Sequence, residues 1–128
     1  MFNFRKPTGI VYLLLFIFTL LISNSVLAGG GDEAAAKLAW PMIERGDLLI
    51  DVRSAEEFSD GHLKDAIHID WDDYEALMGT IGEDKQRAVV FYCRSGNRAG
   101  KSIKVLETKG YNNIFNATGL EALKATKP

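Results

Sequence analysis

Short apolar runs alternate with helical patterns from residue 48 to the end of this chain of 128 residues. Strands are predicted at residues 48–52, 66–69, 88–92 and 113–116, and the run at 48–52 suits a strand buried on both faces. Each predicted strand is followed by a helical pattern, at residues 54–58, 72–78, 99–109 and 120–127. Strands that alternate with helices are joined by right-handed crossovers and form a parallel sheet covered on both sides. The alternation therefore predicts an α/β fold.

The first 28 residues have the pattern of a secretory signal peptide. Arg5 and Lys6 form a basic region, residues 9–22 are almost wholly apolar, and small residues precede a cleavage point after Ala28. The apolar stretch is shorter than the roughly 20 residues that span a bilayer. We expect cleavage and a periplasmic location, with an uncleaved membrane anchor as the alternative. A glycine-rich lead-in and an N-terminal helix, bent or interrupted at Pro41, are expected over residues 29–47.

Removal of the predicted signal peptide leaves 100 residues, enough for one domain, which we place at residues 48–128. The formal net charge then changes from −2 to −4, because Arg5 and Lys6 are lost. An acidic chain of this kind is a poor partner for nucleic acid or an anionic membrane surface. We expect no stable membrane association after cleavage, and a monomer or weak dimer.

Cys93 is the single cysteine and stands where a predicted strand ends and a helical pattern begins. Ligands bind beyond the carboxyl ends of parallel strands, which is where this thiol is placed. The free N–H groups of the helix's first turn, together with Arg94 and Arg98, favour the thiolate. A lone thiol in an oxidising compartment has no internal disulfide partner, and its placement at the strand-to-helix turn makes Cys93 the candidate nucleophile.

The segment from Cys93 to Arg98 is short enough to wrap around one sulfur atom. Its successive backbone N–H groups can form an anion-binding nest, to which Ser95 and Asn97 contribute mainly main-chain donors. Gly96 permits the positive φ that such a nest requires. This loop predicts binding of a small anion next to the thiol.

Further motifs accompany the cysteine loop in a fixed order. They are Leu49-Ile50-Asp51-Val52-Arg53 with Glu57-Phe58, Gly61-His62-Leu63 with Ala66-Ile67-His68-Ile69, Cys93-Arg94-Ser95-Gly96-Asn97-Arg98, and Gly110-Tyr111 with Gly119-Leu120. In this order and spacing the chain resembles the rhodanese family, and specifically its small single-domain periplasmic sulfurtransferases of the phage-shock type. The resemblance implies a three-layer α/β fold with a parallel sheet of four to five strands flanked by helices. The family's usual Pro-Gly is replaced here by Lys64-Asp65, and its usual first strand is not recognisable before residue 48.

The resemblance also implies a thiosulfate sulfurtransferase that works without metal or other cofactor. Cys93 would attack the outer sulfur of thiosulfate, release sulfite and keep a persulfide, which a thiophilic acceptor (cyanide in assays, a thiol in the cell) would then remove. Arg94 would hold the sulfonate through its planar fork. Arg98 would brace the loop, paired with Asp51.

Two neighbouring features are expected to be structural. Arg53 and Glu57 are four residues apart and would form an ion pair at the start of a short helix, so that Asp51 and Arg53 support the loop. His62 and His68 lack a third donor at metal-ligand spacing, and no metal is expected.

Other functions compete with this interpretation. Cysteine phosphatases and arsenate reductases related to this fold use a Cys-x5-Arg loop, whereas this chain has Cys-x4-Arg, sized for one sulfur atom. A persulfide carrier that serves one partner protein would use the same residues. The segment Asn116-Ala117-Thr118 matches a glycosylation acceptor, a pattern common by chance.

Overall fold

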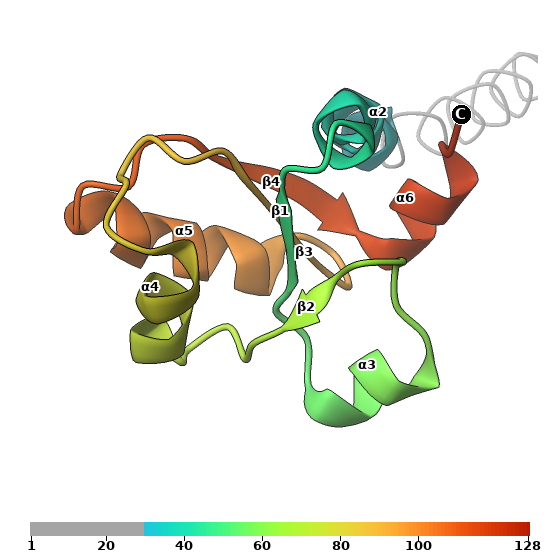
Figure 1. The fold of residues 1–128 in the computed structure, drawn as a ribbon. Coiled ribbons are helices and arrows are strands. Elements are labelled where there is room, and N and C mark those ends of the chain that lie inside the picture. The colour runs from blue at the N-terminus through green and yellow to red at the C-terminus, as the bar shows by residue number, and fades with distance from the viewer. Residues whose placement is uncertain (1–29) are drawn as a thin grey trace, which may run out of the picture. The chain divides into compact units, whose positions relative to one another are not determined.

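A computed structural model describes residues 30–128 of the chain, and the predicted signal peptide lies outside them. The elements, in chain order, are α2 (Gly30–Glu44), β1 (Leu48–Asp51), α3 (Ala55–Asp60), β2 (Ile67–His68), α4 (Tyr74–Ile81), β3 (Val89–Cys93), α5 (Asn97–Thr108), β4 (Ile114–Gly119) and α6 (Leu120–Ala125) (Figure 1). Asp32–Pro128 forms the compact unit that contains the sheet. No helix among residues 30–128 is long and apolar enough to cross a membrane.

The strands form one parallel sheet in the order β2-β1-β3-β4. In its register, Ile50 of β1 lies opposite Ile67 of β2 on one side and opposite Phe91 of β3 on the other. The predicted α/β fold is therefore confirmed, with a four-stranded sheet in the part of the chain that the structure describes. The segment before β1 is the helix α2, which continues through Pro41.

Helices cover both faces of the sheet and make it the middle of three layers (Figure 1). On one face Val52, Phe91 and their neighbours pack against α4 and α5. On the other face Val90 and Tyr92 pack against α2 and α6. The central strands β1 and β3 are largely buried, and apart from Asp51 their residues are apolar. Each fully buried large apolar side chain contributes about 1.5–3 kcal/mol.

Ser54 and Glu57 form a capping box at the start of α3. The Glu57 N–H donates to Ser54 Oγ at 3.2 Å, and the Ser54 N–H donates to Glu57 Oε1 at 3.3 Å. These reciprocal bonds satisfy donors that a helix start leaves free. They begin α3 directly after β1, at the carboxyl edge of the sheet.

The turn before β2, where Lys64-Asp65 replaces the family's usual Pro-Gly, has an unusual backbone conformation. Asp65 has φ of 66°, in the left-handed region where glycine is normally found. Its side chain is exposed, and aspartate tolerates this region better than bulkier residues. The positive φ of Asp65 therefore carries a conformational cost.

Candidate active site

Cys93 ends β3 at the carboxyl edge of the sheet, as predicted. Its side chain is almost wholly enclosed, with 1% exposed. The backbone N–H of Gly96 donates to Cys93 Sγ at 3.0 Å. The chain therefore turns back around the sulfur within three residues and points a main-chain dipole at it.

Gly96 makes this turn possible. It has φ of 87° and serves as the N-cap of α5, without a side-chain capping bond. A Cβ at this position would lie 3.2 Å from Thr118 Cα and 3.4 Å from Asn116 Oδ1. Both the backbone conformation and the close approach of β4 therefore require glycine here.

Asn116 of β4 ties the cysteine loop to the sheet. Its Nδ2 donates to the Gly96 carbonyl at 2.9 Å, while its Oδ1 accepts the Thr118 N–H at 3.0 Å. The Gly96 N–H faces the sulfur, and the Gly96 carbonyl belongs to the next peptide group along the chain. Asn116 therefore holds the peptide group that directly follows the one facing the sulfur. In the sequence, Asn116 is recognisable only as part of a glycosylation pattern. No local pattern in the sequence predicts its contact with Gly96, which lies 20 residues earlier.

The end of β4 is bent to fit against the loop. Phe91 pairs with Asn116 and Cys93 pairs with Gly119, so β4 contains one more residue than β3 between these two pairs. Thr118 takes φ of 68° within the irregularity. A Cβ on Gly119 would come within 2.1 Å of the Arg94 carbonyl oxygen, so only glycine fits. This irregularity carries β4 beyond its predicted end at residue 116.

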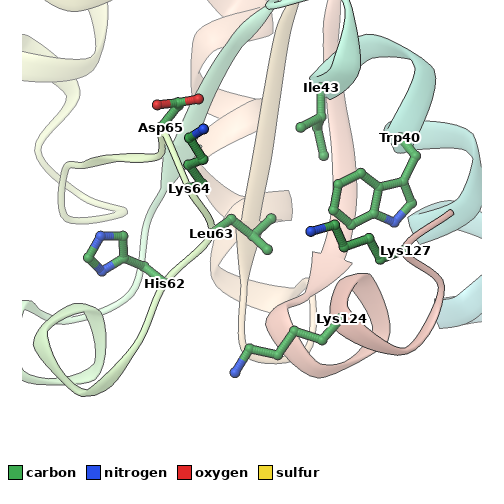
Figure 2. A pocket seen from close by; sticks show the side chains of 8 residues that line it. All are labelled: Trp40, Ile43, His62, Leu63, Lys64, Asp65, Lys124 and Lys127. Atoms are coloured by element: carbon green, nitrogen blue, oxygen red, sulfur yellow. The ribbon is translucent and has the colours of Figure 1, made fainter.

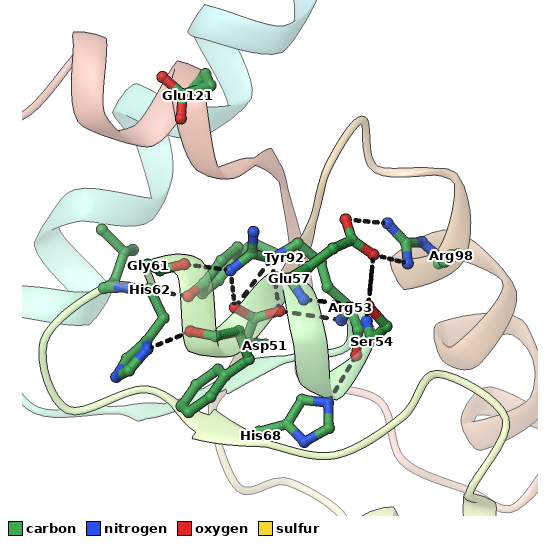
Figure 3. A network of polar contacts seen from close by, with 12 residues as sticks. Asp51, Arg53, Ser54, Glu57, Gly61, His62, His68, Tyr92, Arg98 and Glu121 are labelled. Atoms are coloured by element: carbon green, nitrogen blue, oxygen red, sulfur yellow. Dashed lines mark hydrogen bonds and ion pairs between the residues drawn. The ribbon is translucent and has the colours of Figure 1, made fainter.

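Arg98, the last residue of the loop, pairs with Glu57 of α3 (Figure 3). Two parallel bonds, of 2.7 Å and 3.0 Å, join the guanidinium to the carboxylate. Arg98, and to a smaller extent the bonds from Ser54, lower the pKa of Glu57 to about 2. The same pairing raises the pKa of Arg98. One carboxylate thus caps α3 and holds the cysteine loop.

The predicted pairs of Arg98 with Asp51 and of Arg53 with Glu57 are wrong. Arg53 instead binds Asp51, with contacts of 2.7 to 3.1 Å, and its Nη2 donates to the Gly61 carbonyl at 2.6 Å. Arg53 precedes the N-cap of α3, so the four-residue helical spacing to Glu57 does not apply.

Asp51 and Arg53 form a buried ion pair beside Tyr92, the residue before Cys93. Asp51 is fully buried and also accepts the Arg53 N–H at 3.0 Å. The guanidinium carbon of Arg53 lies 5.9 Å from the Tyr92 ring centre, and burial raises the pKa of Tyr92 above its ordinary range. A buried pair needs full hydrogen bonding to be tolerated, and these contacts supply it.

Arg94, Ser95 and Asn97 are exposed on the outside of the loop. Arg94 lines a hollow of about 280 Å³ together with Arg53, Glu57, Asp60, Leu120 and Glu121. Arg53 and Glu57 are held in ion pairs, whereas Arg94 forms none within residues 30–128, and the hollow also carries the carboxylates Asp60 and Glu121.

The two histidines make contacts with backbone carbonyls. His62 Nδ1 lies 2.8 Å from the Phe58 carbonyl, with the two rings stacked at 3.6 Å between centres. His68 Nε2 lies 2.7 Å from the Arg53 carbonyl. No group of three or more potential metal-ligating side chains occurs within residues 30–128.

The fold and site define an α/β domain with a cysteine loop at the carboxyl edge of a parallel sheet. The sequence model of the rhodanese-like domain family matches residues 35–125 of the chain. The chain therefore belongs to the rhodanese family. The resemblance seen in the sequence is confirmed.

Relatives with known names support this assignment. The chain is 32% identical over 78 residues to thiosulfate sulfurtransferase PspE of Escherichia coli, which covers 61% of this chain and 75% of that protein. It is 30% identical over 91 residues to thiosulfate sulfurtransferase GlpE of Pseudomonas savastanoi, which covers 70% and 84%. Among solved structures, a rhodanese with anions from E. coli is similar, with a TM-score of 0.55 and 31% identity over 60% of this chain and 91% of that one.

Proposed function

We propose that this protein is a thiosulfate sulfurtransferase that carries sulfane sulfur as a persulfide on Cys93. The observation that carries the proposal is the Gly96 N–H directed at Cys93 Sγ at 3.0 Å, within a Cys-x4-Arg loop. Two relatives that the chain largely covers are named thiosulfate sulfurtransferases, in agreement with this chemistry.

The reaction has two displacement steps. The Cys93 thiolate attacks the outer sulfur of thiosulfate, the sulfur–sulfur bond of thiosulfate breaks, and sulfite leaves with the bonding electron pair. A thiolate or cyanide acceptor then attacks the terminal sulfur of the persulfide and regenerates the Cys93 thiolate. Covalent catalysis of this kind gives ping-pong kinetics. The Gly96 N–H that faces the sulfur stabilises its negative charge without reorganisation.

Arg94 is proposed to bind the sulfonate end of thiosulfate. Its exposed guanidinium at the hollow next to the loop can hold two oxygens at once. Arg98 has a different role, because its guanidinium is already paired with Glu57. This ion pair keeps the cysteine loop closed. No metal or other cofactor takes part in the scheme.

The proposed location is the periplasm, reached through cleavage of residues 1–28. Thiosulfate is then the small-molecule donor, and the physiological acceptor is a thiol. N-terminal sequencing of the protein recovered from the cell envelope tests the cleavage after Ala28.

A thiosulfate-to-cyanide assay tests the activity itself. Wild type and a Lys104→Gln control, changed on the exposed surface of α5, are expected to form thiocyanate steadily, whereas Cys93→Ser forms none. Mass spectrometry after thiosulfate treatment should show one added sulfur atom on Cys93. Turnover that survives in Cys93→Ser contradicts the proposal. Formation of the persulfide with a single turnover only would identify a carrier, and comparable hydrolysis of p-nitrophenyl phosphate would identify a phosphatase.

A further inference from the structure

A second hollow, of about 400 Å³, lies between α2, α6 and the loop at residues 62–65 (Figure 2). None of the residues of the cysteine loop lines it. A volume of this size is in the range of sites that take small molecules, roughly 300–1,000 Å³. The proposed sulfur transfer makes no use of it.

The floor of this hollow is apolar and held in place. Trp40, Ile43 and Leu63 supply it. Trp40 Nε1 donates to the Leu123 carbonyl at 3.1 Å and to Thr126 Oγ1 at 3.2 Å, so the polar atom of the indole is already satisfied. The Leu63 N–H donates to the Tyr92 hydroxyl at 3.1 Å, which anchors the loop from the sheet side. The floor therefore exists before any ligand binds.

The rim of the hollow is cationic, although the whole chain has a formal net charge of −2. Three lysines line it, Lys64, Lys124 and Lys127, against one carboxylate, Asp65. Figure 2 shows the Lys127 side chain lying next to the Trp40 ring, with its ammonium turned towards Leu63. Within residues 32–128, only Lys124 of the three makes an ion pair, an exposed contact of 3.4 Å with Glu121.

We propose that this hollow binds a small organic anion with an apolar body, namely an aromatic or branched aliphatic carboxylate or sulfonate. The apolar part packs on Trp40, Ile43 and Leu63, and the acid group lies among the lysines. Charge complementarity excludes an amine of the same shape. Desolvation of the apolar part on a preformed surface favours binding, and the lysines select the sign of the ligand's charge.

Intrinsic fluorescence provides a direct test, because the chain has two tryptophans and Trp71 does not line the hollow. In a Trp71→Phe background the remaining Trp40 reports on its own surroundings. We expect 3-phenylpropanoate to change this fluorescence saturably and 3-phenylpropylamine at equal concentration to leave it unchanged. The affinity should fall as salt is added, because exposed charges are screened.

Two triple variants with the same change in net charge complete the test. Substitution of Lys64, Lys124 and Lys127 by Gln should weaken binding of 3-phenylpropanoate roughly tenfold or more. Substitution of the exposed lysines Lys37, Lys104 and Lys109 by Gln should leave it within about twofold. Circular dichroism checks that both variants fold. Absence of a saturable signal, equal binding of the amine, or equal losses in the two triple variants would overturn the proposal. Sulfur transfer is not the readout, so this result is independent of the proposed activity.

Discussion

Glu57→Gln removes the charge that holds Arg98, and with it the link between α3 and the cysteine loop. Glutamine still accepts the Ser54 N–H in a capping box, so the start of α3 is largely kept. What is lost is the charge-assisted pair of 2.7 Å and 3.0 Å contacts with Arg98. The substitution therefore isolates the ion pair from the cap.

The magnitude follows from the pKa of Glu57, which lies at about 2 against an ordinary value of 4.5. Each unit of pKa corresponds to about 1.4 kcal/mol, so the whole shift corresponds to about 3 kcal/mol. The two side chains are 28% and 31% exposed, and solvent screening reduces this to about 1–2 kcal/mol. Because the pKa is lowered on folding, this stability is present above pH 4.5 and is lost as the pH falls towards 2.

Urea unfolding followed by circular dichroism at pH 7, 4, 3 and 2 measures the difference. Glu57→Gln should unfold with about 1–2 kcal/mol less free energy than wild type at pH 7, and the two should converge near pH 2. Glu56→Gln, one residue earlier on the same helix and exposed, is the matched control and should differ little from wild type.

A double-mutant cycle with Arg98→Gln isolates the pairwise contribution. We expect a coupling free energy of about 1–2 kcal/mol at pH 7 that disappears near pH 2. A coupling near zero at pH 7, or a destabilisation of Glu57→Gln that is the same at every pH, would refute the assignment of this stability to the ion pair.

Three further substitutions probe the site and its surroundings. Arg94→Ala should raise the KM for thiosulfate several-fold with little change in stability, and unchanged kinetics would remove Arg94 from substrate binding. Asn116→Ala should lower kcat about tenfold or more, because the peptide after Gly96 loses its anchor; activity equal to wild type would contradict this. Asp65→Gly should raise the free energy of unfolding by about 0.5–1 kcal/mol, since glycine adopts the positive φ without strain, and a lower urea midpoint would speak against it.

Local patterns in the chain determined the sheet, the helices that cover it and the place of Cys93. The runs at residues 48–52 and 88–92 are short and, apart from Asp51, apolar, and the capping partners Ser54 and Glu57 are three residues apart, so each feature is visible in a few neighbouring residues. Cys93 could be placed because a strand-to-helix transition in a parallel sheet always points to the same edge.

The pairing of the charges was decided only by the tertiary structure. Glu57 and Arg98 are 41 residues apart and meet because α3 and the start of α5 lie at the same edge of the sheet. Asp51 and Arg53, although neighbours, pair because the strand ends between them and turns both side chains into a buried space. The contact of Asn116 with Gly96 likewise depends on the irregular end of β4. Hydrogen bonds and ion pairs of this kind depend on which strand ends converge in space, and distance along the chain does not encode that.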